Sequence, residues 1–280
     1  MTGTHTTAAE AIRTLRKQPD MAGLIEDSYL DTDTDGYWDR FHQSAEFAAV
    51  RRLLGRETTG LRVLDLGAGV GMAAYAFARS GAAFVCAAEP DSSDEVGYRS
   101  LLRRPLDDLH VSVVEAFGET LPFGNETFDI VYCRQVLHHA RDLDRMVAEM
   151  ARVARPGGQV LACREHVVRN DRELARFLEN HPVHAMAGNE HAFRLAEYEK
   201  AFRRAGLALT RALRPLESVI NAYPRARSDE ELAALPARWL ARAGAAGRIL
   251  AGNAVVDSSL RAIAVRRAPG SMYTFLATRP

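Results

Sequence analysis

Residues 63–71 read VLDLGAGVG, and this stretch decides the fold of the chain. A short apolar run ends at Asp65 and Leu66, and glycines follow at alternating positions, Gly67, Gly69 and Gly71. Glycine lacks a Cβ atom, so backbone amides at such a turn can come close to a ligand and the chain can adopt positive φ values. The stretch therefore predicts a buried strand that ends in a ligand-binding turn.

The composition of the 280 residues is that of an ordinary globular protein. Apolar residues make up 47% and charged residues 26%, close to the average for folded domains. Lysine plus arginine and aspartate plus glutamate both number 36, so no overall basic charge recruits nucleic acid. We therefore expect one large domain, or one domain with a lid, and no nucleic-acid partner.

The cysteines and the apolar runs indicate the compartment. Cys86, Cys133 and Cys163 are odd in number and each lies in an apolar run, which favours buried free thiols in a reduced cytoplasm. The N-terminal residues lack the apolar stretch of a signal peptide. No apolar run approaches the ~20 residues that a membrane span needs. We expect a cytoplasmic protein without a membrane partner.

Short apolar runs alternate with helical patterns between residues 40 and 163. We expect strands at 62–66, 83–88, 111–114, 128–133 and 159–163, and helices at 40–54, 72–79, 93–103 and 143–154. Apolar strands joined by helices are typical of a parallel sheet that is covered on both faces. Ligands bind such sheets beyond the carboxyl ends of the strands, where the glycine turn lies.

The pattern changes after residue 165. Helices near 171–180 and 195–205 flank a histidine-rich loop, and residues 229–266 are mostly helical. Strands at 207–213 and 272–278 suit an antiparallel edge. The chain thus predicts an α/β fold. Its doubly wound, seven-stranded, mostly parallel sheet is Rossmann-like, with a C-terminal antiparallel edge strand and helical lid insertions.

Four blocks of sequence carry a family resemblance. They are VLDLGAGVG at 63–71, CAAEPD at 86–91, GETLPFGNETFDIVYCRQVLHH at 118–139 and RVARPGGQVL at 152–161. In this order and spacing the chain resembles the class I S-adenosylmethionine-dependent methyltransferases, in particular the group with small-molecule substrates. The resemblance covers residues 37–165 and the edge strands. A nicotinamide dehydrogenase would share the turn, but its GxGxxG pattern needs a glycine where Met72 stands.

The resemblance implies a division of the chain and a cofactor. Residues 1–55 would form an N-terminal helical lid and residues 56–165 the cofactor-binding core. Residues 166–280 would supply the substrate-pocket insertion, the lid helices and the edge strands. The cofactor is expected to be S-adenosyl-L-methionine, which leaves as S-adenosyl-L-homocysteine.

The turn after the first strand would hold the amino-acid tail of that cofactor. The amides of Ala68 and Gly69, between Gly67 and Gly71, can meet its carboxylate. Asp65 can accept a hydrogen bond from its ammonium group or act through water.

The second and third strands would hold the nucleoside. Glu89 ends the second strand, where a carboxylate can accept both ribose hydroxyls, and Pro90 can pack on the adenine. Gly118 and Glu119 lie where the family contacts adenine. The family often has an aspartate two residues before this glutamate, and Phe117 replaces it here.

The fourth strand ends at Cys133 and Arg134, where the family uses backbone carbonyls to hold the cofactor ammonium. Two interpretations of the Arg134 side chain stay open: it reaches an anionic substrate, or it stacks on its neighbours.

The candidate catalytic residues are His138, His139 and His166. His138 stands where plant-type small-molecule O-methyltransferases carry a histidine general base. An imidazole of ordinary pKa, ~6.5, suits proton removal from a hydroxyl or amine. A Leu-His-His sequence is also common in this fold where no base is known, so a structural role stays open.

Other polar and aromatic residues are candidates for the substrate pocket. They are Trp38, Arg134, Glu165, His184, His191 and Tyr198. Trp38 belongs either to a lid or to the core. The spacing of the histidines after residue 165 matches no known zinc pattern, so we expect polar pocket lining and no metal.

We therefore expect an S-adenosylmethionine-dependent methyltransferase that acts on a small molecule, with transfer to oxygen, nitrogen or carbon. A specialised metabolite of bacterial secondary metabolism, a sugar or a small acid fits best. Two alternatives stay open: a cofactor-binding protein that catalyses a cyclisation or rearrangement, and a non-catalytic cofactor-binding subunit. We expect a monomer or a homodimer.

Overall fold

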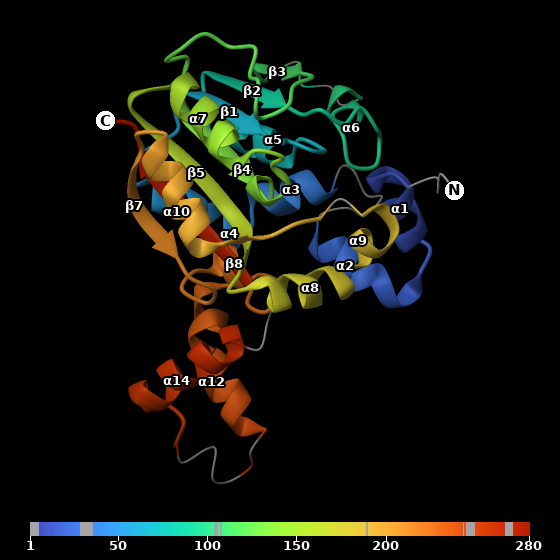
Figure 1. Ribbon diagram of the computed structural model, residues 1–280, viewed down its shortest axis with the longest axis vertical. Helices are drawn as coiled ribbons and strands as arrows, with labels where there is room; N and C mark the ends of the chain where they lie inside the picture. The colour runs from blue at the N-terminus through green and yellow to red at the C-terminus, as the bar shows by residue number, and fades with distance from the viewer. Residues whose placement is uncertain are drawn as a thin grey trace.

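The structure, a computed structural model, describes residues 6–28, 36–103, 106, 108–188, 190–242, 244, 250–266 and 271–280. Figure 1 shows a central sheet with helices packed around it. The strands are β1 (Arg62–Leu66), β2 (Phe84–Ala88), β3 (Val111–Val114), β4 (Phe128–Arg134), β5 (Ala154–Val168), β6 (Phe193–Arg194), β7 (Ala208–Leu213) and β8 (Ser271–Thr278).

The helices come mainly before β4 and after β5 in the chain. They are α1 (Ala8–Leu15), η1 (Pro19–Met21), α2 (Ala22–Asp27), α3 (Gly36–His42), α4 (Ala45–Leu54), α5 (Met72–Arg79), α6 (Arg99–Leu102), η2 (Leu137–His139), α7 (Leu143–Val153), α8 (Asp171–Glu179), α9 (Pro182–Ala187), α10 (Leu195–Arg204), α11 (Val219–Ala222), α12 (Asp229–Ala241) and α14 (Ala254–Arg266). Within the described part of the chain, none of them reaches the length and apolarity that crossing a bilayer requires.

The sheet has the order β3-β2-β1-β4-β5-β8-β7, with β6 paired to β5. Strands β1 to β5 are parallel to one another, and β8 is antiparallel to both β5 and β7. The α/β class, the mostly parallel sheet and the antiparallel edge are thereby confirmed. The sheet has eight strands rather than the seven expected, because the two-residue β6 adds to it.

Two apolar clusters cover the two faces of the sheet. Leu64 of β1 and Val131 of β4 belong to one cluster, with residues of α7 and α10. Val63 and Ile130, their neighbours along the same strands, belong to the other, with residues of α3, α4 and α5. Successive strand residues thus face opposite layers, which is why these strands are apolar throughout. The three cysteines are free and buried.

Several expected boundaries change where tertiary contacts act. The helix expected at 93–103 shrinks to α6. The helix expected at 40–54 is two helices, α3 and α4, because the side chain of Ser44 caps a new helix by accepting from the amide of Phe47 at 3.0 Å. The fifth strand runs well beyond its expected limits and pairs with both β4 and β8.

The segments expected to form lids differ in position. Helices α1 and α2 pack on α9 through Ile12, Leu15 and Ile25, which contact Val183. In contrast, α3 and α4 cover a face of the sheet. Helices α12 and α14 stand away from the sheet at the lower end of Figure 1.

Candidate active site

The turn from β1 to α5 is bent by glycines that no other residue could replace without strain. Gly67 has φ +64°, and a Cβ there would lie 2.4 Å from Cγ2 of Val136. Gly71 has φ +83° and precedes the first residue of α5. The turn therefore lies directly against the segment that follows β4, which brings the ends of β1 and β4 to one place.

Glu89, at the end of β2, is bound to this turn. Its Oε2 accepts the amide of Gly69 at 2.8 Å, and its Oε1 accepts the amide of Asp91 at 2.9 Å. Burial raises the pKa of the Glu89 carboxyl, and these two amide hydrogen bonds oppose the rise. The amide of Ala68 donates to the carbonyl of Ala88 at 3.2 Å. The two amides expected to meet the cofactor carboxylate therefore have protein partners in this structure.

Asp65 lies behind the turn, beneath the cavity wall. It is 2% exposed, and its Oδ2 has no hydrogen-bond partner among the described residues. Burial raises the pKa of the carboxyl to about 8; a hydrogen bond from the backbone of Ala74 opposes this, and the charge of Glu89 adds to it. Such an unsatisfied buried acid is costly, which is typical of functional sites.

A cavity of about 990 Å³ opens at the carboxyl ends of the parallel strands. Its wall includes Gly67, Ala68, Gly69, Glu89 and Pro90 after β1 and β2. Helices α1, α2 and α9 and the segment 215–225 contribute further residues. None of the described residues of α12 or α14 lines it. Its position matches the expected ligand crevice of a doubly wound sheet.

The residues expected to contact adenine also reach this cavity. Phe117 is 54% exposed, and the guanidinium of Arg141 lies 5.4 Å from its ring centroid. A Cβ at Gly118 would lie 2.8 Å from Cε of Met146, so a larger residue there requires the Met146 side chain to move. The Glu119 carboxylate accepts the amide of Arg141 at 2.9 Å, at the start of α7. Glu119 therefore also positions the chain before α7.

His138 and Glu165 form a buried pair at the ends of β4 and β5. Nδ1 of His138 lies 2.8 Å from Oε2 of Glu165, and both residues are almost completely buried. The carboxylate also accepts the amides of Val136 and His138, both at 3.1 Å. With a carboxylate as its partner, Nδ1 carries the hydrogen, and the Nε2 lone pair faces the cavity wall. Burial holds the pKa of His138 well below its ordinary value, so the imidazole is neutral near pH 7.

Further imidazoles gather around His138. His139 and His166 have ring centroids 4.2 Å and 4.8 Å from that of His138, and both line the cavity. His181, directly before α9, and Glu190, in the loop between α9 and β6, line it as well. Burial lowers the pKa of His181. The three candidate catalytic histidines are therefore brought together, and the loop adds two more polar groups.

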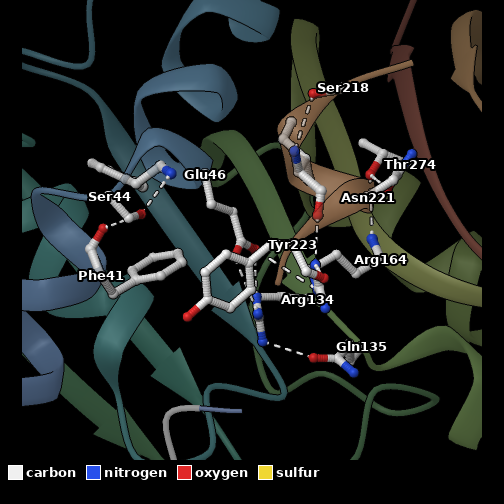
Figure 2. Close-up of polar contacts among 12 residues, drawn as sticks. Phe41, Ser44, Glu46, Arg134, Gln135, Arg164, Ser218, Asn221, Tyr223 and Thr274 are labelled. Atoms are coloured by element: carbon white, nitrogen blue, oxygen red, sulfur yellow. Dashed lines mark hydrogen bonds and ion pairs between the residues drawn. The ribbon is translucent and has the colours of Figure 1, made fainter. Parts of the chain in front are cut away.

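Arg134 lies in the wall beside a second arginine that the sequence did not single out. Figure 2 shows Glu46 facing Arg134 and Arg164. Glu46 accepts from Nε and NH2 of Arg134 at 2.7 and 3.2 Å, and lies 4.0 Å from Nε of Arg164. One buried carboxylate thus compensates two guanidinium groups, and both arginines line the cavity. The sequence did contain one signal for this cluster: Glu46 stands beside Phe47, Ala49 and Val50, which are the buried apolar residues of α4.

Arg164 also supports the segment that follows β7. Its NH1 donates to the carbonyls of Ile220 and Tyr223 at 2.7 and 3.0 Å, and its own amide donates to Thr274 (Figure 2). Arg164 has φ +61° and Gln135 has φ +58°. Non-glycine residues in this region cost ~1–3 kcal/mol each and gather at functional sites. Gln135 directly follows β4, and Arg164 lies within β5 where its pairing with β8 shifts register.

Four of the residues expected to bind substrate lie elsewhere. Trp38 is completely buried, and its indole donates to the carbonyl of Val70 at 3.0 Å, beneath the glycine turn. Tyr198 is completely buried, and its hydroxyl donates to the carbonyl of His166 at 3.0 Å. His184 and His191 are half-buried and do not line the cavity. Trp38 and Tyr198 therefore pack in the core and do not line the cavity.

Three other expected site residues also lie behind the wall. Glu165 is completely buried and supports His138, as described above. Cys133 is completely buried, with its thiol 3.9 Å from Glu165. Gly71 shapes the turn and is absent from the wall.

Comparison with known proteins shows which proteins this chain resembles. Residues 64–162 match the family described as a methyltransferase domain. A ubiquinone biosynthesis O-methyltransferase of Rhizobium etli is 30% identical over 159 residues, which cover 55% of this chain and 63% of that protein. The chain thus spans less than two thirds of the length of the curated relatives that it matches.

Solved structures share the fold at low identity. An S-adenosylmethionine-dependent methyltransferase from Mesorhizobium loti superposes with a TM-score of 0.56 at 18% identity, covering 85% of this chain and 99% of that one. The cyclase SpnF superposes with a TM-score of 0.53 at 20% identity, covering 83% of this chain and 80% of that one. Residues 64–162 of this chain therefore match a methyltransferase domain, and its fold is similar to that of S-adenosylmethionine-dependent methyltransferases.

Proposed function

We propose that this chain transfers the methyl group of S-adenosylmethionine to a small molecule. The observation that carries the proposal is a single cavity that reaches from Glu89 and the glycine turn to His138. Its volume of about 990 Å³ lies at the upper end of ligand pockets, which span roughly 300–1,000 Å³. Cofactor and acceptor can therefore occupy it together.

The cofactor is assigned to the part of the cavity nearest β1 and β2. Glu89 is the proposed acceptor for the ribose hydroxyls, and Pro90, Phe117 and Gly118 form the proposed adenine wall. The amino-acid tail would follow the turn 67–71 towards the end of β4. Asp65 is assigned an indirect role, since it supports the turn from behind.

The acceptor is assigned to the part of the cavity beside His138. The sulfonium methyl is already electrophilic, so the protein has to align the acceptor with the carbon–sulfur bond and keep water out. The neutral Nε2 of His138 is the proposed proton acceptor, because Glu165 fixes the opposite nitrogen as the donor. His139 and His166 would orient the acceptor group.

The walls suggest the chemistry of the acceptor. Ile12, Leu15 and Leu24 of α1 and α2 make the lid side apolar, while Arg134 and Arg164, which share the carboxylate of Glu46, leave one net positive charge in the wall. We therefore propose an acceptor with an apolar body and an acidic group, such as a hydroxylated aromatic acid of specialised metabolism. The similarity to a ubiquinone biosynthesis O-methyltransferase of Rhizobium etli is compatible with such an acceptor.

Calorimetry and mass spectrometry test this proposal. Purified protein should bind S-adenosylmethionine, and Glu89→Ala should weaken binding at least tenfold. Glu57→Ala, which removes an exposed acid paired with Arg51, should leave it unchanged. A panel of hydroxylated aromatic acids should yield a product heavier by one methylene. A product isomer of unchanged mass would instead support a cyclase, and cofactor binding without turnover would support a non-catalytic subunit.

A further inference from the structure

His138, His139 and Glu190 converge on one point of the cavity wall. Among the described residues, these three offer ligand atoms that all lie within 4.8 Å of one another. Oε2 of Glu190 is 3.8 Å from Nε2 of His138 and 3.8 Å from Nε2 of His139. Its Oε1 is 3.9 Å from Nδ1 of His181. The four side chains come from η2, from the residue before α9 and from the loop before β6.

The distances from Glu190 to His138 and His139 are too long for hydrogen bonds and closer to the spacing of two ligands on one ion. A nitrogen–oxygen distance of 3.8 Å exceeds the ~3.2 Å limit of a good hydrogen bond. Ligand atoms ~2.1 Å from a tetrahedral ion stand ~3.4 Å apart. The two separations from Glu190 lie a few tenths of an ångström from this value. The widest pair of ligand atoms is within 4.8 Å, so a common coordination shell requires that pair to close by up to ~1.4 Å.

Glu165 gives His138 the support that a metal-bound imidazole requires. It lies 2.8 Å from Nδ1 of His138, opposite the Nε2 atom that faces Glu190. Two backbone amides, of Val136 and His138, orient the Glu165 carboxylate in turn. A carboxylate on the far nitrogen is the common way in which proteins fix the tautomer of a metal ligand.

The surroundings of Glu190 also favour a cation. Its side chain is 9% exposed, and among the described residues its ionic partners are the imidazoles of His138, His139 and His181. A carboxylate that leaves water is stable only when a positive charge or a metal compensates it. An ion between the imidazoles and this carboxylate supplies that charge.

We infer that His138, His139 and Glu190 bind one divalent transition-metal ion, whose remaining coordination positions are left for water or the acceptor. Two imidazoles and one carboxylate suit Zn²⁺, Co²⁺ or Fe²⁺ and disfavour Mg²⁺ and Ca²⁺, which prefer oxygen ligands. The spacing of these residues along the sequence favoured pocket lining without a metal. Their convergence is visible only in the folded chain.

The site would act within the proposed reaction. A hydroxyl of the acceptor that coordinates the ion has a lowered pKa and loses its proton to solvent more readily. In that state Nε2 of His138 is a ligand, and the ion takes over the proton-removing role proposed above. Metal binding itself goes beyond the proposed transfer, and it is measured without cofactor or acceptor.

Cobalt titration of the full untagged chain tests the inference. The protein is stripped with a chelator, exchanged into metal-free buffer and titrated with Co²⁺, whose visible spectrum reports coordination by nitrogen ligands. Zn²⁺ competition gives the affinity for zinc. We expect one Co²⁺ per chain, displaced by one Zn²⁺.

Variants locate the ion. His139→Ala and Glu190→Gln should each weaken Co²⁺ binding at least tenfold, and Glu165→Gln should weaken it ~10–100-fold, as is usual for supporting carboxylates. The His139 side chain is 38% exposed, so its removal should leave the fold intact, which circular dichroism checks. His110→Ala is the matched control, because His110 is exposed and lies outside the cluster. Absence of stoichiometric Co²⁺ binding by the wild-type chain overturns the inference, as does binding that His139→Ala and Glu190→Gln leave unchanged.

Discussion

Replacing Asp65 by asparagine should stabilise the chain at neutral pH in the absence of cofactor. Asp65 is 2% exposed, and its Oδ2 has no hydrogen-bond partner among the described residues. Burial raises the pKa of the carboxyl in the folded chain from 3.8 to about 8. In the unfolded chain the group titrates near its ordinary pKa, ~3.9. The folded state therefore holds a proton that the unfolded state releases.

The pKa difference sets the sign and the size of the effect. A raised folded-state pKa stabilises the fold fully below pH ~4, and this contribution is lost as the pH rises towards ~8. Each pH unit in that window costs ~1.4 kcal/mol. The wild-type chain thus loses about 4 kcal/mol at pH 7, relative to pH 4, through this one group. Asparagine has nearly the same shape and does not titrate.

Urea unfolding at pH 5, 6, 7 and 8, without cofactor, measures the effect. The free energy of unfolding of Asp65→Asn minus that of the wild-type chain should increase by ~1.4 kcal/mol per pH unit up to pH 7 and by less near pH 8, since other titrating groups cancel in the difference. Cofactor affinity should fall in the same variant, because the glycine turn loses its acidic support.

Asp129→Asn is the matched control for this prediction. Asp129 lies on the neighbouring strand and accepts from the amide of Arg62 at 2.8 Å and from Arg155 at 3.0 Å. Its replacement should lower stability at every pH, because it removes satisfied hydrogen bonds. A difference for Asp65→Asn that stays constant, or falls as the pH rises, would refute the reasoning.

Three further substitutions test the packing around the cavity. Gly67→Ala should destabilise by ~3 kcal/mol or more, because its Cβ meets Val136 at 2.4 Å; Gly157→Ala, at φ +73° with open space, should cost only the ~1–2 kcal/mol of the backbone conformation. Equal losses in urea unfolding would contradict the steric argument. Glu46→Gln should destabilise by ~3–5 kcal/mol, because two buried guanidinium groups lose their carboxylate, whereas the exposed Glu57→Gln should cost under ~1 kcal/mol. Thermal unfolding that ranks the two variants equally would argue against a buried charge cluster. Trp38→Phe should cost ~1–2 kcal/mol, since the carbonyl of Val70 loses its donor, and an unchanged urea midpoint would remove this role.

The sequence by itself determined the helices and strands whose limits are marked by nearby residues. The bounds of β1, β3 and α5 follow directly from the apolar runs at 62–66 and 111–114 and from the glycines around 72–79. Each of these elements depends on neighbours a few residues away. The alternation of apolar strands and helices was enough to predict the α/β class, the mostly parallel sheet and the edge of the sheet at which the cavity lies.

Elements whose limits depend on distant partners escaped that reasoning. Strand β5 extends to Val168 because β6 and β8 pair with its end. The sequence near 164–168 does not indicate these partners. Trp38 and Tyr198 looked like pocket residues from their place in the chain. Their burial depends on which face of a helix meets the sheet, and packing decides that.

The polar centre of the cavity was decided by tertiary structure alone. Glu46 meets Arg134 across 88 residues of chain, and Glu165 meets His138 across 27. Glu190 reaches His138 from a loop that leaves the sheet and returns to it. The sequence by itself identified the chemical groups and the cofactor family, because those signals are local. Which carboxylate compensates which cation depends on how the crossovers bring separate strand ends together, and only the folded chain contains that information.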